Sequence, residues 1–313
     1  MSIALPAALP AFDVLRSECL PVVALDQPRP RRALRIALLN LMPDKPVTET
    51  QHARLLAAGG HDVELTLLLP KNYRSKSTSA AHLDAFYRRW SEVRGEAFDG
   101  LIVTGAPLET LDFEKVDYWD ELTEIFDWAR GRVRRSFYIC WAAQAALYHY
   151  HGVPKHVRER KCFGVFKHRV AKRSAKLLEC VADDFWIPVS RHTEVRQSDL
   201  AGARGLEILV EGAETGPCLL EDRARGAHYM FNHLEYDADT LKREYLRDIA
   251  AERPVELPKN YFPEGNLDRA PVNFWRQAAC ALYSNWLDEI ERDRDVSETL
   301  ARRRAKGLVS AAA

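Results

Sequence analysis

An α/β fold with a mostly parallel, doubly wound sheet is predicted for this chain of 313 residues. The first observation is a series of apolar runs at 33–39, 61–69, 99–104 and 136–140, which is typical of strands buried on both faces. The second is that helical patterns at 48–58, 80–94 and 114–130 separate these runs. Strands that alternate with helices form right-handed βαβ units, and these build a parallel sheet covered on both sides.

The rest of the chain adds shorter elements. A capping-box pattern at 48–51 predicts that the first helix begins at Thr48. Short apolar runs at 206–211, 218–221 and 228–231, separated by turns that contain glycine, predict an antiparallel extension of the sheet. A helix is expected at 272–290. We divide the chain into an extended N-terminal arm at 1–33, one main domain at 34–290 and a frayed, basic C-terminal tail at 291–313.

Composition excludes several classes of protein. The 45 Lys and Arg residues balance the 45 Asp and Glu residues, so no overall positive charge favours nucleic acid as a partner. No apolar run is long enough to span a bilayer, and no signal peptide is evident, so we predict a cytoplasmic protein. The six cysteines include no C-x-x-C pair, which argues against a disulfide framework and against a metal site.

Cys140 is the first candidate catalytic residue. It closes an apolar strand and precedes a helix-favouring segment rich in alanine at 141–146. A strand-to-helix turn places its side chain at the carboxyl edge of the sheet, where ligands of α/β proteins bind. The same turn puts the sulfur at a helix N-terminus, which favours the thiolate. Position alone favours an inert buried cysteine, because cysteine is among the most buried residue types.

A possible base for this thiol follows the run at 228–231. A nucleophilic thiol needs a base within reach, and the base needs a group that holds its tautomer. His233 and Glu235 are two residues apart, so on a strand both side chains would point to one face. Together with Cys140, the pair resembles the Cys-His-Glu triad of class I glutamine amidotransferase-like folds.

Seven segments in the same order extend this resemblance to a particular family. They include Leu-Asn-Leu-Met-Pro-Asp-Lys at 39–45 and Cys-Trp-Ala-Ala-Gln-Ala-Ala at 140–146, and the others lie at 98–107, 116–119, 190–191, 235–237 and 260–263. The sequence is similar, from about residue 34 to residue 287, to the homoserine O-acyltransferase family. The resemblance implies transfer of an acyl group from acyl-coenzyme A (acyl-CoA) to the hydroxyl of L-homoserine, in methionine biosynthesis.

The resemblance also implies roles for individual residues. Cys140 matches the nucleophile that becomes an acyl-thioester, His233 the general base and Glu235 the third member of the triad. Lys161, Ser190 and Arg247 match substrate-binding positions, although outside the resemblance Lys161 and Arg247 are ordinary surface charges. Acyl-CoA acts as a co-substrate, no permanently bound cofactor is expected, and a homodimer is implied.

Two further expectations concern the acyl group. An oxyanion hole is required, and we expect its donors to be the backbone N–H groups of Trp141 and Leu108. Pro107 has no N–H and is excluded. Glu109 stands where members of the family that use acetyl-CoA carry glutamate and those that use succinyl-CoA carry glycine. A carboxylate there repels a succinyl group, so Glu109 favours acetyl-CoA, with succinyl-CoA as the alternative donor.

Three departures from the family pattern leave the acceptor open between L-homoserine and L-serine. Asn232 and Leu234 replace the glycine and proline on either side of His233, and Val189 stands before Ser190 where histidine is common. Asn232 could preserve a left-handed turn, and Leu234 could let His233 move. Two other classes of function remain: a glutaminase-like hydrolase that uses the same triad, and a non-catalytic relative. The segment after residue 287 also departs from the family.

Overall fold

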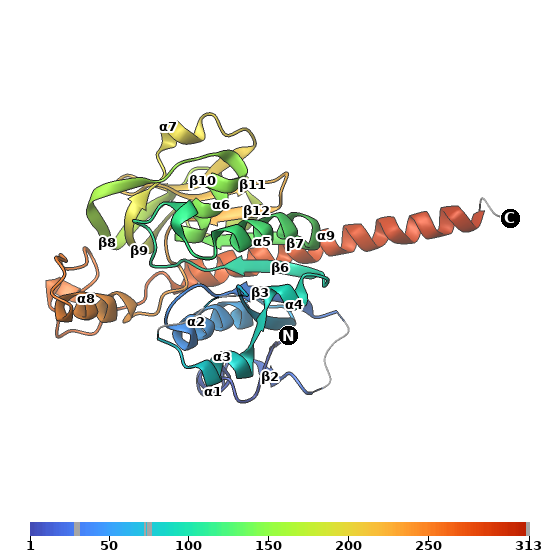
Figure 1. The fold of residues 1–313 in the computed structure, drawn as a ribbon, viewed down its shortest axis with the longest axis horizontal. Coiled ribbons are helices and arrows are strands. Elements are labelled where there is room, and N and C mark those ends of the chain that lie inside the picture. Colours follow the sequence, from blue (N-terminus) through green and yellow to red (C-terminus); the bar gives the residue numbers. More distant parts are fainter. Residues whose placement is uncertain (28–31, 72, 74–76, 311–313) are drawn as a thin grey trace.

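The central sheet confirms the predicted α/β fold (Figure 1). The computed structural model describes residues 1–27, 32–71, 73 and 77–310. Within them, twelve strands form one sheet with the order β2-β1-β4-β3-β6-β7-β12-β11-β10-β8-β9, and β5 pairs with β4 outside this path. The consecutive pairs from β2 to β12 are parallel and those from β12 to β9 are antiparallel.

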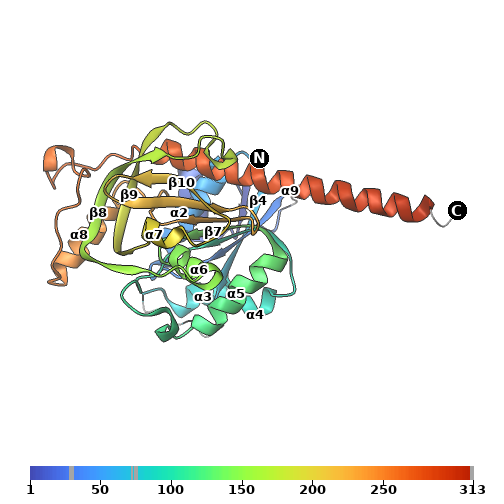
Figure 2. The same cartoon turned by 90° about the horizontal axis from the view of Figure 1, so that it is seen from above.

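The four apolar runs predicted as strands form four of the parallel strands. They are β3 (Leu34–Leu39), β4 (Val63–Leu69), β6 (Phe98–Val103) and β7 (Val133–Ile139). Ile36 and Leu38 pack into one apolar core with helices α2 (Lys45–Ala58) and α9 (Arg276–Ser310). Leu39, from the same strand, packs into a second core with α5 (Trp119–Arg132) and α6 (Trp141–His151). The sheet is therefore buried on both faces because helices cover each side (Figure 2).

The antiparallel extension is larger than predicted. The expected strands are β10 (Leu206–Gly212), β11 (Gly216–Asp222) and β12 (Ala227–Met230). A long hairpin of β8 (His156–Val170) and β9 (Asp184–Glu194) continues beyond them. The sequence did not predict this hairpin, because the first half of β8 carries a run of charged residues that are exposed or only partly buried.

The segment expected to be an extended arm is part of the sheet instead. It forms β1 (Ile3–Leu5), α1 (Pro10–Ser17) and β2 (Val22–Ala24), and β1 pairs in parallel with both β2 and β4. Ile3 and Leu5 are completely buried. The prediction of an arm was wrong for these residues because three-residue strands carry too little pattern to be recognised. Residues 28–31 lie outside the described part of the chain.

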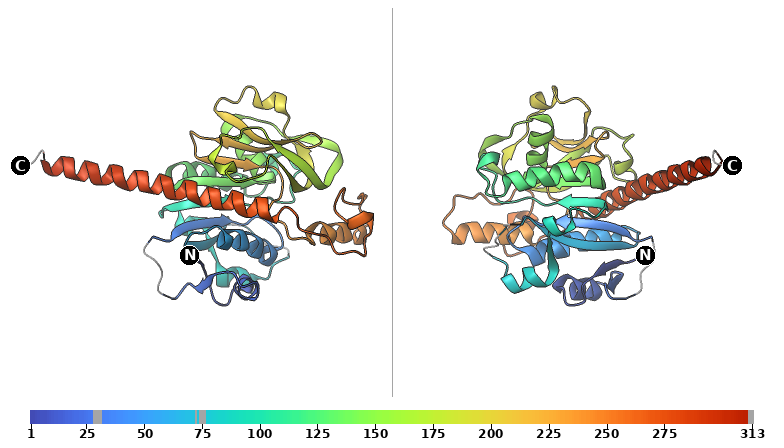
Figure 3. Two further views of the ribbon diagram at one scale, coloured as in Figure 1. Left: turned by 180° about the vertical axis from the view of Figure 1, so that it is seen from behind. Right: turned by 45° about the vertical axis from the view of Figure 1, so that its right-hand side comes forward.

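Three helical predictions also need correction. Helix α2 begins at Lys45, one turn before Thr48, with the Asp44 side chain accepting the N–H of Val47 at 3.4 Å. The single helix expected at 80–94 is divided into α3 (Ala80–Phe86), β5 (Tyr87–Arg89) and α4 (Trp90–Val93), because β5 pairs with the edge of β4. Instead of fraying, the tail continues α9 to Ser310, and its distal half projects beyond the body of the molecule (Figures 1 and 3).

The remaining elements are short. They are α7 (Gln197–Leu200), α8 (Thr240–Ala250) and the 3₁₀ turns η1 (Phe113–Lys115), η2 (Lys176–Leu178) and η3 (Pro263–Gly265). None of the helices in the described residues has the length and apolar character needed to cross a membrane.

Candidate active site

Cys140 lies on a strained turn between β7 and α6. Its φ of 52° and ψ of −116° are unusual for a residue with a side chain, and such strain is concentrated at functional sites. Its backbone N–H donates to the Met230 carbonyl at 2.7 Å, which ties the turn to β12. A Cβ added to Gly105 would lie 3.1 Å from the Cβ of Cys140, so a larger residue there would crowd the turn. The sulfur therefore stands at the carboxyl edge of the sheet, as predicted.

His233 and Glu235 form a buried pair just beyond the end of β12. His233 Nδ1 lies 2.6 Å from Glu235 Oε1, and the two residues are 3% and 5% exposed. They lie in a turn rather than on the strand itself, so their contact comes from the turn and not from strand alternation. Burial opposes a charge on the imidazole, but Glu235 and Cys140 outweigh it and raise the pKa of His233 well above its ordinary value. Burial likewise opposes the charge of Glu235, and His233 outweighs it and lowers the pKa of that carboxyl.

Tyr236, which follows Glu235 in the chain, packs against His233. Its ring stacks on the imidazole of His233 with the centroids 4.2 Å apart and the planes 14° from parallel. Tyr236 is 7% exposed, so water is largely excluded from this face of the imidazole. The contact of Tyr236 with His233 could not be predicted from the sequence, because only the tertiary structure shows which face of the imidazole the ring covers.

A cleft of about 300 Å³ brings the predicted residues together. Cys140 and His233 line it from the sheet edge, and Glu109 lines it from the loop after β6. Lys161, Ser190 and Arg247 line it as well, although they come from β8, β9 and α8. Six residues chosen from the sequence therefore meet in one cavity. Glu235 stands behind His233 and is not part of the lining.

Two acidic residues of α8, missed in the sequence analysis, organise the far side of the cleft. Glu244 Oε1 accepts from Lys161 Nζ at 2.8 Å and from Ser190 Oγ at 2.6 Å. Asp248 Oδ1 accepts from Arg247 Nη2 at 2.8 Å and Asp248 Oδ2 accepts from Lys161 Nζ at 3.3 Å. Helical spacing puts Glu244 and Asp248 on one face, and this i, i+4 pattern was the available signal.

One of the two predicted oxyanion donors is not available. The N–H of Leu108 donates to the Ala106 carbonyl at 2.8 Å, because the loop turns tightly at this point. Leu108 also does not line the cleft. Trp141 is the first residue of α6, where backbone N–H groups have no partner within the helix. Gly105 and Ala106 line the cleft beside Cys140 and replace Leu108 as candidates.

Glu109 lies in a loop that is anchored from outside the cleft. Lys155 donates to the backbone carbonyl of Glu109 at 2.8 Å and to that of Leu111, and its ammonium lies 4.2 Å from the ring centroid of Phe113. These contacts hold the loop by its backbone, so the Glu109 side chain is not needed to fix it. The side chain therefore remains available to the cleft.

The three departures from the family pattern leave the cleft intact. Asn232 does not have a positive φ, so it does not preserve a left-handed turn as expected. Its side chain is buried and donates to His168 Nε2 at 2.9 Å, which ties the start of the turn to β8. Leu234 packs into the apolar core that also contains Ile36 and Leu38, and it does not line the cleft. Val189 packs against Cys162 and Phe166, also outside the cleft lining.

Lys45 holds the loop that follows β3. It is completely buried and donates to the carbonyls of Asn40 at 2.7 Å and Met42 at 3.0 Å. Burial lowers its pKa to about 7. Met42 and Pro43 line the cleft, so this lysine supports part of the cleft wall.

Comparison with known proteins agrees with this geometry. The model of a family described as homoserine O-succinyltransferase matches residues 2–294. The chain belongs to the homoserine O-succinyltransferase family. A homoserine O-acetyltransferase of Cereibacter sphaeroides is 49% identical over 292 residues, which are 93% of this chain and 96% of that protein. One of Hyphomonas neptunium is also 49% identical, over 92% of this chain and 95% of that protein.

Solved structures identify the fold of this homoserine O-succinyltransferase family member. A putative GMP synthase subunit of Thermoplasma acidophilum has a TM-score of 0.56 at 12% identity, over 86% of this chain and all of that one. A glutamine amidotransferase of Thermotoga maritima has a TM-score of 0.54 at 10% identity, over 83% of this chain and 99% of that one. The fold is therefore that of class I glutamine amidotransferases, as the triad suggested.

Proposed function

We propose that this chain is a homoserine O-acetyltransferase that works through a Cys140 acyl-thioester. The observation that carries the proposal is the placement of Cys140 and His233 in one cleft with Glu109, Lys161 and Arg247. The names of the relatives support the acetyl donor, and the family description keeps succinyl-CoA as the alternative.

In the first half-reaction, the sulfur of Cys140 attacks the thioester carbonyl of acetyl-CoA. The bond between the acyl carbon and the CoA sulfur breaks, and the protonated His233 gives its proton to the departing thiolate. One thioester replaces another, so little free energy is lost. We propose that the backbone N–H groups of Trp141 and of Gly105 or Ala106 receive the developing oxyanion, which is supported by Trp141 being the first residue of α6 and by Gly105 and Ala106 lining the cleft.

In the second half-reaction, neutral His233 takes the proton of the homoserine hydroxyl as the oxygen attacks the acyl carbon. The carbon–sulfur bond breaks and Cys140 leaves as the thiolate, beside a His233 that is protonated again. The charge on Cys140 contributes to the raised pKa of His233. Acylation removes that charge, so the imidazole loses its proton more readily and becomes the base that the second step needs.

The acceptor site is proposed on the α8 side of the cleft. Arg247 is placed to bind the carboxylate of the amino acid, because a guanidinium matches a carboxylate in geometry and charge. Glu244 accepts from Lys161 and Ser190, and it offers a negative charge for the ammonium group of the substrate. L-serine remains the alternative acceptor. The homodimer stays a prediction from the resemblance, and the cytoplasmic location stays a prediction from the composition of the sequence.

Release of CoA by the purified protein tests the function. Acetyl-CoA and succinyl-CoA are each offered against L-homoserine, L-serine and water. We expect turnover with acetyl-CoA and homoserine that exceeds every other combination. Release that is equally fast without an amino acid would indicate a hydrolase, and no release with any pair would indicate a non-catalytic relative.

Removal of the ring beneath His233 tests the role of Tyr236. An aromatic face stabilises an imidazolium by about 1 kcal/mol. In Tyr236→Leu we therefore expect the acidic limb of kcat against pH to move down by about one unit. The matched variant Tyr236→Phe keeps the stacked ring and should keep the wild-type profile. A merely structural role for Tyr236 would lower kcat without moving the limb.

A further inference from the structure

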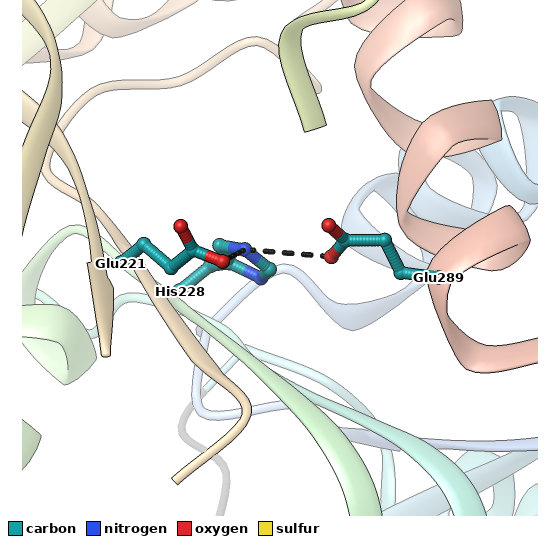
Figure 4. Close-up of side chains that lie close together, drawn as sticks. All are labelled: Glu221, His228 and Glu289. Carbon is teal, nitrogen blue, oxygen red and sulfur yellow. Dashed lines mark ion pairs between the residues drawn. The ribbon is translucent and has the colours of Figure 1, made fainter. Parts of the chain in front are cut away.

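A second cluster of functional side chains lies away from the cleft. Glu221 on β11, His228 on β12 and Glu289 on α9 each offer one ligand atom, and the three atoms lie within 4.8 Å of one another (Figure 4). His228 is completely buried, and the two glutamates are each 5% exposed. None of the three lines the catalytic cleft. His228 precedes the catalytic His233 by five residues on the same segment.

The buried imidazole of His228 lacks hydrogen-bond partners among the described residues. Neither ring nitrogen of His228 forms a hydrogen bond within the part of the chain that the structure describes. Glu289 Oε2 also forms none there, but it is in an ion pair with Arg135 Nη1 at 3.2 Å. Buried polar atoms without partners are costly, so this arrangement needs an explanation. His228 Nε2 lies 3.8 Å from Glu221 Oε1 and 3.6 Å from Glu289 Oε2, beyond hydrogen-bond distance in both cases.

These separations fit a shared metal ion. Zinc binds histidine nitrogen and carboxylate oxygen at about 2.0–2.2 Å, so two of its tetrahedral ligand atoms stand about 3.3 Å apart. The two separations at His228 Nε2 exceed this value by about 0.3–0.5 Å, and the two carboxylate oxygens lie within 4.8 Å of each other, so the three side chains must close around the ion. One imidazole and two carboxylates are hard-to-borderline ligands, which suit a divalent first-row transition ion.

Arginine side chains hold both carboxylates of the cluster. Arg223 donates to Glu221 Oε2 at 3.0 Å and leaves Oε1 facing His228. Arg135 Nη1 lies 3.2 Å from Glu289 Oε2, the oxygen that also faces His228, so a bound ion would share this oxygen with the guanidinium. Arg135 Nε also pairs with Asp293 at 2.8 Å. Ligating carboxylates are commonly held by such outer partners. Arg223 also pairs with Glu207 at 3.4 Å, so its charge is shared between Glu221 and Glu207.

We propose that Glu221, His228 and Glu289 bind a divalent transition-metal ion that clamps helix α9 to strands β11 and β12. The site is buried, joins three elements and lies outside the lining of the cleft, so we assign it a structural role. Three protein ligands leave one position of a tetrahedral ion for a water molecule. The clamp joins α9 to the strand that leads to His233. The absence of short ligand spacing in the sequence gave no sign of this site, because its ligands meet only after folding.

Metal analysis of the full-length protein tests the proposal. The protein is stripped with a chelator, dialysed, titrated with Zn²⁺ alone, and assayed for bound metal and melting temperature. We expect one zinc per chain and a rise in melting temperature of about 5 °C at saturation. Glu289→Gln keeps the shape of the side chain but removes its charge, and we expect it to weaken zinc binding about 100-fold and to lose the rise.

Two controls separate this site from other zinc binding. Asp288→Asn removes the adjacent, half-exposed carboxylate of α9 and should keep both the stoichiometry and the rise. Cys140→Ala removes the thiol that could capture zinc beside His233, and it should keep them as well. Zinc binding that depends on Cys140 and not on Glu289 would overturn the proposal. So would a wild-type melting temperature that neither chelator nor zinc changes, which would leave a protonated His228 bridging the two carboxylates.

Discussion

We expect Cys140→Ala to abolish formation of the acyl-enzyme and to lower kcat by at least about 10⁴-fold. Among the described residues that line the cleft, Cys140 carries the only thiol, so its loss removes the covalent step rather than weakening it. Intact mass spectrometry after incubation with acetyl-CoA alone measures the step directly. The wild-type protein should gain one acetyl group and the variant none.

A matched control distinguishes the nucleophile from other thiols. Cys162 is also buried, but it lines a neighbouring cavity and not the catalytic cleft. Cys162→Ala should therefore still be acetylated once, with a kcat close to that of the wild type. An acetyl group that persists in Cys140→Ala would remove Cys140 from the mechanism, whatever the effect on kcat.

Glu109→Gly should change the preferred donor. The carboxylate of Glu109 faces a cleft of about 300 Å³ and repels the terminal carboxylate of a succinyl group. Its removal both opens space and removes that repulsion. We expect the ratio of kcat/KM for succinyl-CoA to that for acetyl-CoA to rise about 100-fold. Initial rates with each donor at saturating homoserine measure this ratio.

Glu109→Gln separates charge from volume. Glutamine keeps the size of the side chain and removes its charge, so a purely electrostatic effect would raise the ratio nearly as much as glycine does. If neither variant changes the ratio, the donor is selected elsewhere in the cleft. The loop itself should hold in both variants, because Lys155 anchors it through the backbone carbonyls of Glu109 and Leu111.

Much of the parallel half of the fold could be read from the chain. Continuous apolar runs such as 34–39 mark strands buried on both faces, and the tight, alanine-rich segment after Cys140 marks a helix packed closely on the sheet. The charged first half of β8 and the three-residue strands β1 and β2 could not be read in this way. Their pairing is specified by distant strands, and local pattern carries little of that information.

The candidate site divides along the same line. The sequence by itself was enough to select Cys140, His233 and Glu235 as the candidate triad and Glu109 as the candidate donor-selecting residue. Seven ordered segments were enough to identify the family. Only the tertiary structure decided that Leu108 is committed to Ala106, that Tyr236 covers His233, and that Glu244 joins Lys161 to Ser190. Each of these contacts depends on the distance between two side chains or backbone groups and on their orientation. They depend on how β8, β9 and α8 are brought to the edge of the sheet, and a linear order of residues does not contain that geometry.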